Sequence, residues 1–308
     1  MHPREGTFYG QGDIVFYRTH ARPLSVGRIP ESEFTGRPNT IIGMQISATT
    51  SGAAYQRCYT EGDNEILVPT QTFGSYITER SESYEGSTIE GCIDFLARGF
   101  LSRYPQMTHM KIGGSELPFL QVRVSGPDGF QESDALYQRS DNEHATVSFE
   151  YEKIPEGEIV LREHLCGLAN LNLVKMNGNA FAGFPGDEYS NIAPRHERIL
   201  YLAQDFFWRY LDPQDAIAGT TDRYVPAEWV RDIVRSTWHH EKNLSIQHLQ
   251  YQITRNVLRR FPQLAEFRAR RRNVQWKLLS AEDAPAKAYT DRLAYGDIGF
   301  AARREDIE

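Results

Sequence analysis

The sequence predicts an α+β fold in which one arrangement of antiparallel strands and paired helices occurs twice along the chain. The first observation is an internal repeat: Val68-Pro69 recurs as Val225-Pro226, which lies 225 − 68 = 157 positions later. The second is an amphipathic helical pattern at the same offset, and the third is a set of strand-like segments around that pattern. An offset close to half of the 308 residues is typical of two copies of one domain.

The clearest repeated element is a helix. In each copy, five apolar residues recur at spacings of three and four, which places them on one face of a helix. The two sets are Ile89, Cys92, Leu96, Phe100 and Tyr104, and Ile246, Leu249, Ile253, Val257 and Phe261. Thr88 and Ser245 are expected to cap these helices, which should end before Pro105 and Pro262. A shorter helix is expected directly after each Val-Pro pair.

Segments rich in β-branched and aromatic residues flank the helices and are predicted to be strands. They are 12–19, 40–50, 56–60, 110–112, 120–124 and 145–151 in the first copy, and 171–176, 199–210 and 267–279 in the second. Gly126-Pro127-Asp128-Gly129 is an expected hairpin turn. Each copy thus has two strands, two helices and two strands, so that helices cover one face of an antiparallel layer. We place the boundary near Pro155, which gives domains 1–155 and 156–308.

Charge and hydropathy exclude several classes of function. The chain has 34 Lys and Arg against 41 Asp and Glu, and a net charge of −7 argues against a general nucleic-acid binder. The basic run 268–272 is therefore expected to be a solvated strand or an interface edge. No apolar run of about 18 residues occurs, so we expect no membrane span. Residues 1–12 show no secretory signal.

Cysteine and histidine usage points to neither disulfides nor metals. Cys58, Cys92 and Cys166 lie far apart and form no C-x-x-C pair, which makes a disulfide framework and a cysteine zinc site unexpected. Three reduced thiols indicate a cytoplasmic protein. His239-His240 is followed by no H-x-x-x-H spacing, so we expect no metal.

Four motifs resemble the urate oxidase (uricase) family, in its bacterial form. They are Tyr9-Gly10-Gln11-Gly12-Asp13, Tyr84-Glu85-Gly86-Ser87-Thr88-Ile89-Glu90-Gly91, Gly183-Phe184-Pro185-Gly186-Asp187-Glu188-Tyr189 and Leu244-Ser245-Ile246-Gln247-His248-Leu249. The resemblance covers nearly the whole chain. It implies two tandem tunnelling-fold (T-fold) domains per chain and a homotetramer that forms a barrel-like tunnel, with active sites at subunit interfaces. It also implies that no metal or organic cofactor is used, because the substrate gives its electrons to O2.

The resemblance assigns the polar substrate contacts. Arg198 matches the family arginine that pairs with the 2-oxo and N3 edge of the substrate, and a guanidinium suits this role because its planar fork makes two parallel hydrogen bonds. Gln247 matches the glutamine that binds the 6-oxo and N1 edge, where a carboxamide can donate to an oxygen and accept from an N–H. Glu90 holds the place equivalent to Gln247 in the first copy.

The remaining matches concern the substrate face, its walls and oxygen. Phe181 matches the ring that stacks on the substrate, Ile192 an apolar wall, and Ile246 a wall whose amide also faces the substrate. Asn273 matches the asparagine at the oxygen or water site above the ring. Thr70 matches the threonine that reaches into the site of a neighbouring subunit.

The positions that handle protons depart from the family pattern. Gln11 stands at the place of the family lysine, Gln275 lies in the region that aligns with the family histidine, and Gln71 replaces the aspartate after Thr70. We group Gln11 and Gln275 with Thr70 and Asn273 as catalytic positions, and Gln71 with the substrate-binding residues. A glutamine does not titrate and cannot relay a proton as lysine or histidine does. The resemblance thus implies a retained binding half and a replaced proton relay.

Three functions remain open. The first is a cofactor-independent oxidase for a planar, urate-like bicyclic dione other than urate, such as a purine-, pteridine- or pyrimidotriazine-like ring in specialised biosynthesis. The second is urate oxidase with a rearranged relay that uses water. The third is a non-enzymatic protein that binds purine-like ligands. Gln11 argues against the second, and Thr70 with Asn273 against the third, since a binder needs no oxygen site. We favour the first, with no nucleic-acid or membrane partner.

Overall fold

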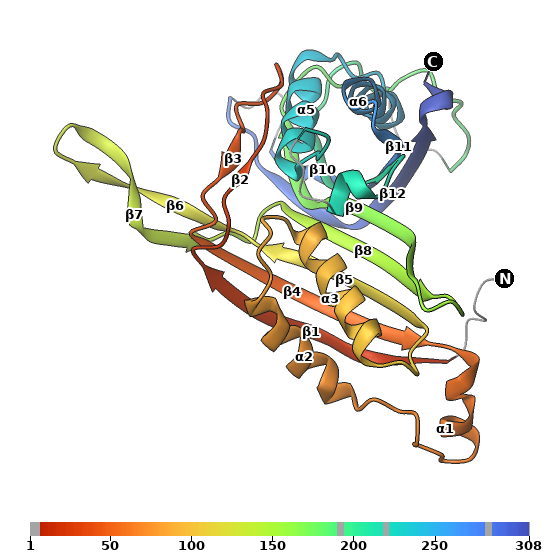
Figure 1. Cartoon of the computed structure of the whole chain (residues 1–308). Coiled ribbons are helices and arrows are strands. Elements are labelled where there is room, and N and C mark those ends of the chain that lie inside the picture. The colour runs from red at the N-terminus through yellow and green to blue at the C-terminus, as the bar shows by residue number, and fades with distance from the viewer. Residues whose placement is uncertain (1–6, 190–193, 218–221, 281–284, 308) are drawn as a thin grey trace. The chain divides into compact units, whose positions relative to one another are not determined.

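The computed structural model describes residues 7–189, 194–217, 222–280 and 285–307. It divides into two units, which are described separately (Figure 1). Unit 1 contains Met1–Gly27, Thr35–Cys166 and Asp212–Tyr224, and unit 2 contains Arg28–Phe34, Gly167–Leu211 and Val225–Glu308. Within the described ranges, no helix combines the length and the apolar character needed to cross a bilayer.

The main sheet of unit 1 has the strand order β1-β4-β5-β8-β9. The strands are β1 (Phe8–Thr19), β4 (Ile41–Ser51), β5 (His109–Leu117), β8 (His144–Lys153) and β9 (Ile159–Lys175), of which β9 belongs to unit 1 up to Cys166. The pairs β1–β4, β4–β5 and β5–β8 are antiparallel. The pairing of β1 with β4 is irregular between Gln11 and Ile14.

Two small ribbons accompany this sheet. One pairs β2 (Leu24–Ser25) with β3 (Gly36–Arg37), and the other pairs β6 (Phe119–Gly126) with β7 (Gly129–Arg139). Gly126 pairs with Gly129 across the turn between β6 and β7, so the expected hairpin turn is confirmed. Gly129 has φ of 119°, a conformation that favours glycine.

Unit 2 has the strand order β9-β10-β11-β12. Its further strands are β10 (Leu200–Tyr210), β11 (Leu264–Leu278) and β12 (Tyr289–Arg303). The pairs β10–β11 and β11–β12 are antiparallel, and Leu202, Asn273 and Gly296 are neighbours across the three strands. The predicted α+β class with antiparallel sheets is therefore confirmed.

The helices occur as the predicted pairs. In unit 1 they are α2 (Thr70–Glu82) and α3 (Ile89–Arg103), and in unit 2 they are α5 (Ala227–His240) and α6 (Ile246–Arg260). Both helices start at the repeat offset, since 227 − 70 and 246 − 89 each equal 157. The caps also repeat: Thr88 Oγ1 accepts from the Gly91 N–H (3.2 Å), and Ser245 Oγ accepts from the His248 N–H (3.0 Å). The internal repeat is thus confirmed at the level of the helices.

The helices bury their apolar faces on the sheets. In unit 1, α2 packs on β1, and α3 packs on β5 and β8 (Figure 1). In unit 2, α6 packs on β11 and β12 and lies beside α5. Leu96, Phe100, Leu249 and Ile253 are fully buried. Burial of each such side chain contributes about 1.5–3 kcal/mol to stability.

Several segments differ from the sequence-based expectation. Strand β9 begins at Ile159, whereas the predicted strand was 171–176, and the short strands β2 and β3 were not expected. The segment 56–60, predicted to be a strand, is the short helix α1 (Gln56–Thr60), and none of its residues is buried against a neighbouring strand. The strands β7 and β12 were not expected from the sequence. All residues of β7 are exposed or half-buried, and β12 contains Gly296 and Gly299, which weaken the strand pattern. The remaining helices are α4 (Gln214–Ile217) and the single 3₁₀ turns at Ala53–Tyr55 and Arg304–Asp306.

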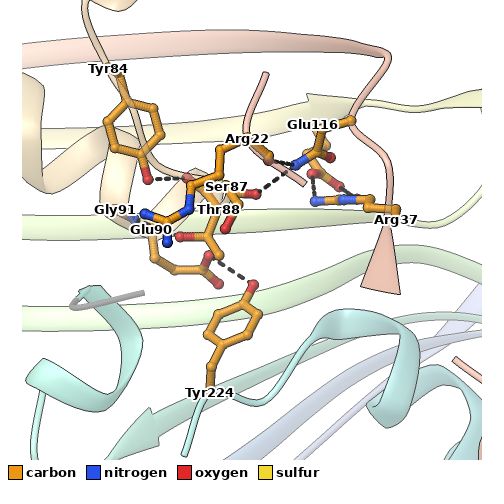
Figure 2. A network of polar contacts seen from close by, with 10 residues as sticks. Arg22, Arg37, Tyr84, Ser87, Thr88, Glu90, Gly91, Glu116 and Tyr224 are labelled. Carbon is orange, nitrogen blue, oxygen red and sulfur yellow. Dashed lines mark hydrogen bonds and ion pairs between the residues drawn. The ribbon is translucent and has the colours of Figure 1, made fainter. Parts of the chain in front are cut away.

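A buried polar network lies at the start of α3 in unit 1 (Figure 2). Glu90 is 2% exposed, and the Tyr224 hydroxyl donates to its Oε2 at 3.0 Å. The Tyr84 hydroxyl donates to the Thr88 carbonyl oxygen at 3.0 Å. Burial raises the pKa of Glu90 from its ordinary value of 4.5 to about 7. The place equivalent to Gln247 is therefore occupied in unit 1 by a buried carboxyl group with a partner from its own chain.

The raised pKa of Glu90 predicts a pH-dependent stability. The protonated carboxyl is favoured in the folded state, so its contribution is complete below pH 4.5 and is lost as the pH rises through about 7. The free energy of unfolding of the wild type should fall by about 3 kcal/mol relative to Glu90→Gln between pH 4.5 and 8. Urea unfolding of both proteins across this range measures the difference. Glu156→Gln, at an exposed position, is the matched control. Parallel pH profiles for the wild type and Glu90→Gln would contradict the assignment.

Candidate functional site

Phe181 and Arg198, two of the predicted substrate-binding residues, are in contact in unit 2. The Arg198 guanidinium carbon lies 5.3 Å from the centroid of the Phe181 ring. The same ring stacks on Phe184, with centroids 4.7 Å apart and planes at 21°. An arginine over an aromatic face is held by cation–π attraction. The aromatic ring and the cation that are predicted to bind one flat ligand are thus neighbours in unit 2.

The charge of Arg198 is poorly compensated by the protein. Burial, followed by the repulsion of Arg195, lowers the pKa of Arg198. Its Nε is buried and has no hydrogen-bond partner among the described residues. A buried donor without an acceptor costs free energy, which a ligand oxygen at this position would recover. The environment of Arg198 is therefore suited to a carbonyl-bearing or anionic ring.

A pair of buried asparagines joins the segments that carry the predicted binding residues. Asn243 Nδ2 donates to Asn179 Oδ1 at 2.8 Å, and Asn179 Nδ2 donates to the Arg198 carbonyl oxygen at 3.1 Å. Both asparagines are 1% exposed. Asn179 precedes Phe181 by two residues, and Asn243 lies two residues before the cap of α6. One amide pair thus connects the Phe181 segment, the Arg198 segment and the start of α6.

Backbone hydrogen bonds reinforce this connection. The Ala180 N–H donates to the Asn243 carbonyl oxygen at 2.7 Å, and the Asn243 N–H donates to the Gly178 carbonyl oxygen at 2.9 Å. Phe181 and Arg195 exchange both of their backbone hydrogen bonds, at 2.7 and 2.8 Å. An irregular segment with its backbone groups satisfied in this way holds a fixed position. The Phe181 ring is consequently presented from a fixed backbone.

Ile246 and Gln247 occupy the first turn of α6. Ile246 is buried, whereas Gln247 is exposed. The N-terminal end of a helix carries partial positive charge and N–H groups that point outward, which favours acceptor atoms of a ligand there. The structure therefore combines an exposed carboxamide, a helix N-terminus and the Asn243 link in one segment.

Two further predicted residues of the second half, Asn273 and Gln275, belong to β11. Asn273 is half-buried in β11, between Leu202 of β10 and Gly296 of β12. Gln275 belongs to β11, at the irregularity between Val274 and Trp276 where the pairing with β12 shifts register. Ile192 lies outside the described residues.

Gln11, Thr70 and Gln71 form a second group, in unit 1. Gln11 Oε1 accepts from the Gly74 N–H at 3.0 Å, and a Cβ at Gly74 would lie 2.7 Å from that oxygen. Thr70 and Gln71 are exposed in the first turn of the same helix, α2. The side chain at the place of the family lysine is thus hydrogen-bonded to the backbone of the helix that carries Thr70.

A cleft of about 470 Å³ adjoins Thr70 and has mostly apolar walls. Tyr9, Leu67, Val68 and Pro69 are among its lining residues. The Tyr9 hydroxyl accepts from the Val68 N–H at 3.2 Å, and burial raises the pKa of this hydroxyl. The volume is within the range of small-molecule sites.

The predicted residues therefore occur as two groups, one in each unit. Unit 2 brings Phe181 and Arg198 together with the start of α6, and in unit 1 Gln11 is hydrogen-bonded to the helix that begins at Thr70. The sequence did not single out Asn179 or Asn243, and only their positions near Phe181 and Ser245 offered a signal. No cluster of three or more His, Cys, Asp or Glu side chains suited to a metal ion occurs in the described ranges.

Comparison with known proteins yields matches over nearly the full chain. A family model described as "Uricase" matches residues 164–293. A uricase of Haloferax volcanii is 38% identical over 89% of this chain and 89% of its own length, and a uricase of Halalkalicoccus jeotgali is 38% identical over 97% of this chain and 99% of its own. A uric acid degradation bifunctional protein of Bacillus sp. (strain TB-90) is 34% identical over 99% of this chain, which spans 62% of that protein's length.

Solved structures show the same similarity in three dimensions. A hyperthermostable mutant of Bacillus sp. TB-90 urate oxidase superposes with a TM-score of 0.94 at 34% identity, over 98% of this chain and 99% of that one. A uricase from Bacillus fastidious also gives a TM-score of 0.94 at 34% identity, over 99% of this chain and 95% of that one.

Proposed function

The chain belongs to the uricase family, and we propose that its reaction is the oxidation of a planar, urate-like bicyclic dione other than urate by O2, without a metal or organic cofactor. It has the α+β fold of urate oxidases and is an oxidoreductase of the uricase type. The observation that carries the proposal is the contact between Arg198 and Phe181, in which a buried guanidinium nitrogen lacks an acceptor. A flat ring with carbonyl oxygens on one edge complements both groups.

The proposed binding mode contacts one polar edge and one face of a bicyclic dione. The Arg198 N–H groups donate to acceptor atoms at one end of the ring edge, and the Gln247 carboxamide at the start of α6 binds the other end. The Phe181 ring covers one face of the ligand. Ile246 and Ile192 supply apolar walls. The asparagine pair supports this mode because it ties the backbone of all three polar and aromatic contacts together.

The proposed exclusion of urate rests on the residues at the proton-relay positions. Gln11 carries no titratable proton, and its Oε1 is already engaged by the Gly74 N–H. Gln275 likewise has no titratable group. A dione that is already anionic, or an easily oxidised dihydro form, needs little help from a base. Such a ring passes its electrons to O2, and we propose that Asn273 and Thr70 line the oxygen position.

We also propose a homotetramer with active sites at subunit interfaces. β1 ends the strand order of unit 1, and β12 ends that of unit 2. Large apolar side chains are exposed on both strands, including Tyr17 (52%) and Tyr295 (56%). Open sheet edges of this kind are covered when chains pair in a closed ring. In the tetramer, Thr70 and Gln11 of one chain would complete the site around Arg198 of another.

Two further features of the proposal concern the chain and its compartment. We propose that the two T-fold domains divide at 155/156, because the helix pairs repeat with an offset of 157.

We place the protein in the cytoplasm, where thiols stay reduced, because its three cysteines are free.

Oxygen uptake tests the proposed substrate class. Without added cofactor, purine-, pteridine- or pyrimidotriazine-diones should support O2 consumption, whereas urate should be slower by about 10² to 10⁴-fold, the usual contribution of general acid–base help. Gln11→Lys alone should not restore urate oxidation, because the histidine position is also changed. Urate turnover at a rate of about 10 s⁻¹, typical of metabolic enzymes, would favour urate oxidase with a rearranged relay.

Calorimetry with xanthine, a planar purine dione, tests the binding residues. Arg198→Ala should weaken binding at least tenfold, because loss of a buried charged partner costs roughly 2 to 5 kcal/mol. Gln247→Ala should weaken it less, since its hydrogen bonds are neutral. Arg195→Ala, which removes a neighbouring exposed arginine, is the control and should bind normally. Unchanged affinity in Arg198→Ala would place the ligand elsewhere.

Complementation tests whether two chains share one site. Arg198→Ala and Thr70→Val chains should each be inactive toward the best dione. Co-expression should restore activity at about a quarter of the sites, because random assembly brings an intact Arg198 half to an intact Thr70 half in that fraction. Mixing the separately purified, stable oligomers is the control. Inactivity of the co-expressed oligomers would mean that each chain builds its site alone.

A further inference from the structure

Arg271 is a fully buried cation without a counter-charge. Its side chain is 0% exposed, and Nε, Nη1 and Nη2 have no hydrogen-bond partner in the described part of the chain. The guanidinium carbon lies 5.4 Å from the centroid of the Phe206 ring. The basic run 268–272 was expected to be solvated, and this expectation is wrong for Arg271. Along β11, Arg270 and Arg272 are exposed, and the strand alternation turns Arg271 to the buried face.

Among the described residues, other buried polar groups without hydrogen-bond partners lie on the two elements that pack against β11, namely β10 and α6. Gln204 is its direct neighbour across the β10–β11 pair, is 1% exposed, and has no partner for Nε2 or Oε1. On α6, Gln250 donates to the Ala269 carbonyl oxygen at 3.2 Å, which places it over the same face of β11. Gln250 Oε1 and, one helical turn later, Thr254 Oγ1 are buried without partners. The four side chains come from β10, β11 and α6 of unit 2, and both β10 and α6 pack against β11.

Among the described side chains of the adjoining strands, no carboxylate pairs with Arg271. Asp205 lies on the opposite face of β10 and accepts from the Asn170 N–H at 2.9 Å. Asp297 of β12 pairs with the exposed Arg270 at 3.2 Å. Burial lowers the pKa of Arg271 to about 9, so the guanidinium stays protonated at neutral pH. Unit 2 therefore contains a buried positive charge that the acidic residues described in the structure do not balance.

A buried charge without a partner costs several kcal/mol, and a buried water molecule provides hydrogen bonds without neutralising the charge. An anion does both. The buried donors available to such an ion include the Arg271 N–H groups, the Gln204 amide N–H groups and the Thr254 hydroxyl. Complete burial restricts the occupant to a small ion, and a single guanidinium matches a single negative charge.

We propose that Arg271, Gln204 and Thr254 form an internal binding site for a small monovalent anion of halide size, between β10, β11 and α6. The bound ion is part of the folded unit 2. It stabilises the strand that carries Asn273, which lies two residues along β11 on the same face. Since the site exists only in the folded state, occupancy raises the stability of the protein.

Thermal unfolding at constant ionic strength tests the site. Replacing sodium gluconate with sodium chloride or bromide should raise the Tm of the full-length protein by about 2–4 °C or more. Arg271→Met keeps the apolar stem and removes the charge, so its Tm should not depend on the halide. Arg272→Met, which removes the adjacent exposed arginine, is the matched control and should keep the full halide response. Equal Tm values of the wild type in gluconate and chloride, or the same response in Arg271→Met, would overturn the proposal.

A second measurement decides the case if Arg271→Met does not fold. Crystals of the wild-type protein grown in sodium bromide should show an anomalous peak beside the Arg271 guanidinium, on the side of Gln204 and Thr254. Bromide located at other positions only, such as beside Arg198, would overturn the proposal. Water density at Arg271 with no anomalous signal would overturn it as well.

Discussion

The hydrogen bond between the Asn243 and Asn179 side chains is the interaction on which the candidate site depends. It is buried, and Asn179 also holds the Arg198 carbonyl oxygen, so the pair fixes three segments that are distant in sequence. Two amides can do this because each offers both donors and an acceptor, which lets one side chain satisfy several backbone and side-chain groups. The Phe181 ring, the Arg198 guanidinium and the first turn of α6 therefore have fixed positions relative to one another. The proposed binding of a dione by these residues depends on their fixed relative positions.

The two repeats use one scaffold for different purposes. Helices α3 and α6 are both 15 residues long, and each is capped by a hydroxyl side chain, that of Thr88 or Ser245. The second residue of α3 is the buried Glu90, whereas the second residue of α6 is the exposed Gln247. In unit 1 the Tyr224 hydroxyl satisfies Glu90 from within the chain. In unit 2 the corresponding residue, Gln247, is exposed to solvent. The first copy instead contributes the exposed Thr70 at the start of α2, with Gln11 bound to the backbone of the same helix. The predicted residues therefore fall into two groups, one in each copy.

Much of the fold was predictable because it follows from local patterns. The apolar stripes, the Thr88 and Ser245 caps and the terminating prolines define α3 and α6 without tertiary information. The prediction of a strand at 56–60 was wrong. This segment forms the helix α1, and none of its residues is buried, a property that its sequence does not reveal. Family resemblance predicted that Phe181 and Arg198 bind one ligand, but not their direct contact. The asparagine pair and the burial of Arg271 depend on contacts between segments far apart in sequence. A run of arginines predicts a solvent-exposed strand. Arg271 is nevertheless buried, because it lies on the face of β11 on which α6 packs.

A crystal structure with a bound, non-oxidisable planar purine dione tests the central claim most directly. The account predicts that the Arg198 guanidinium and the Gln247 carboxamide hold opposite ends of one ligand edge, that the Phe181 ring covers its face, and that the Asn179–Asn243 hydrogen bond is unchanged from its present 2.8 Å. It further predicts that Thr70 of a neighbouring chain borders the same ligand. A ligand bound away from Arg198, or a site that forms only after the asparagine pair breaks, would contradict the account.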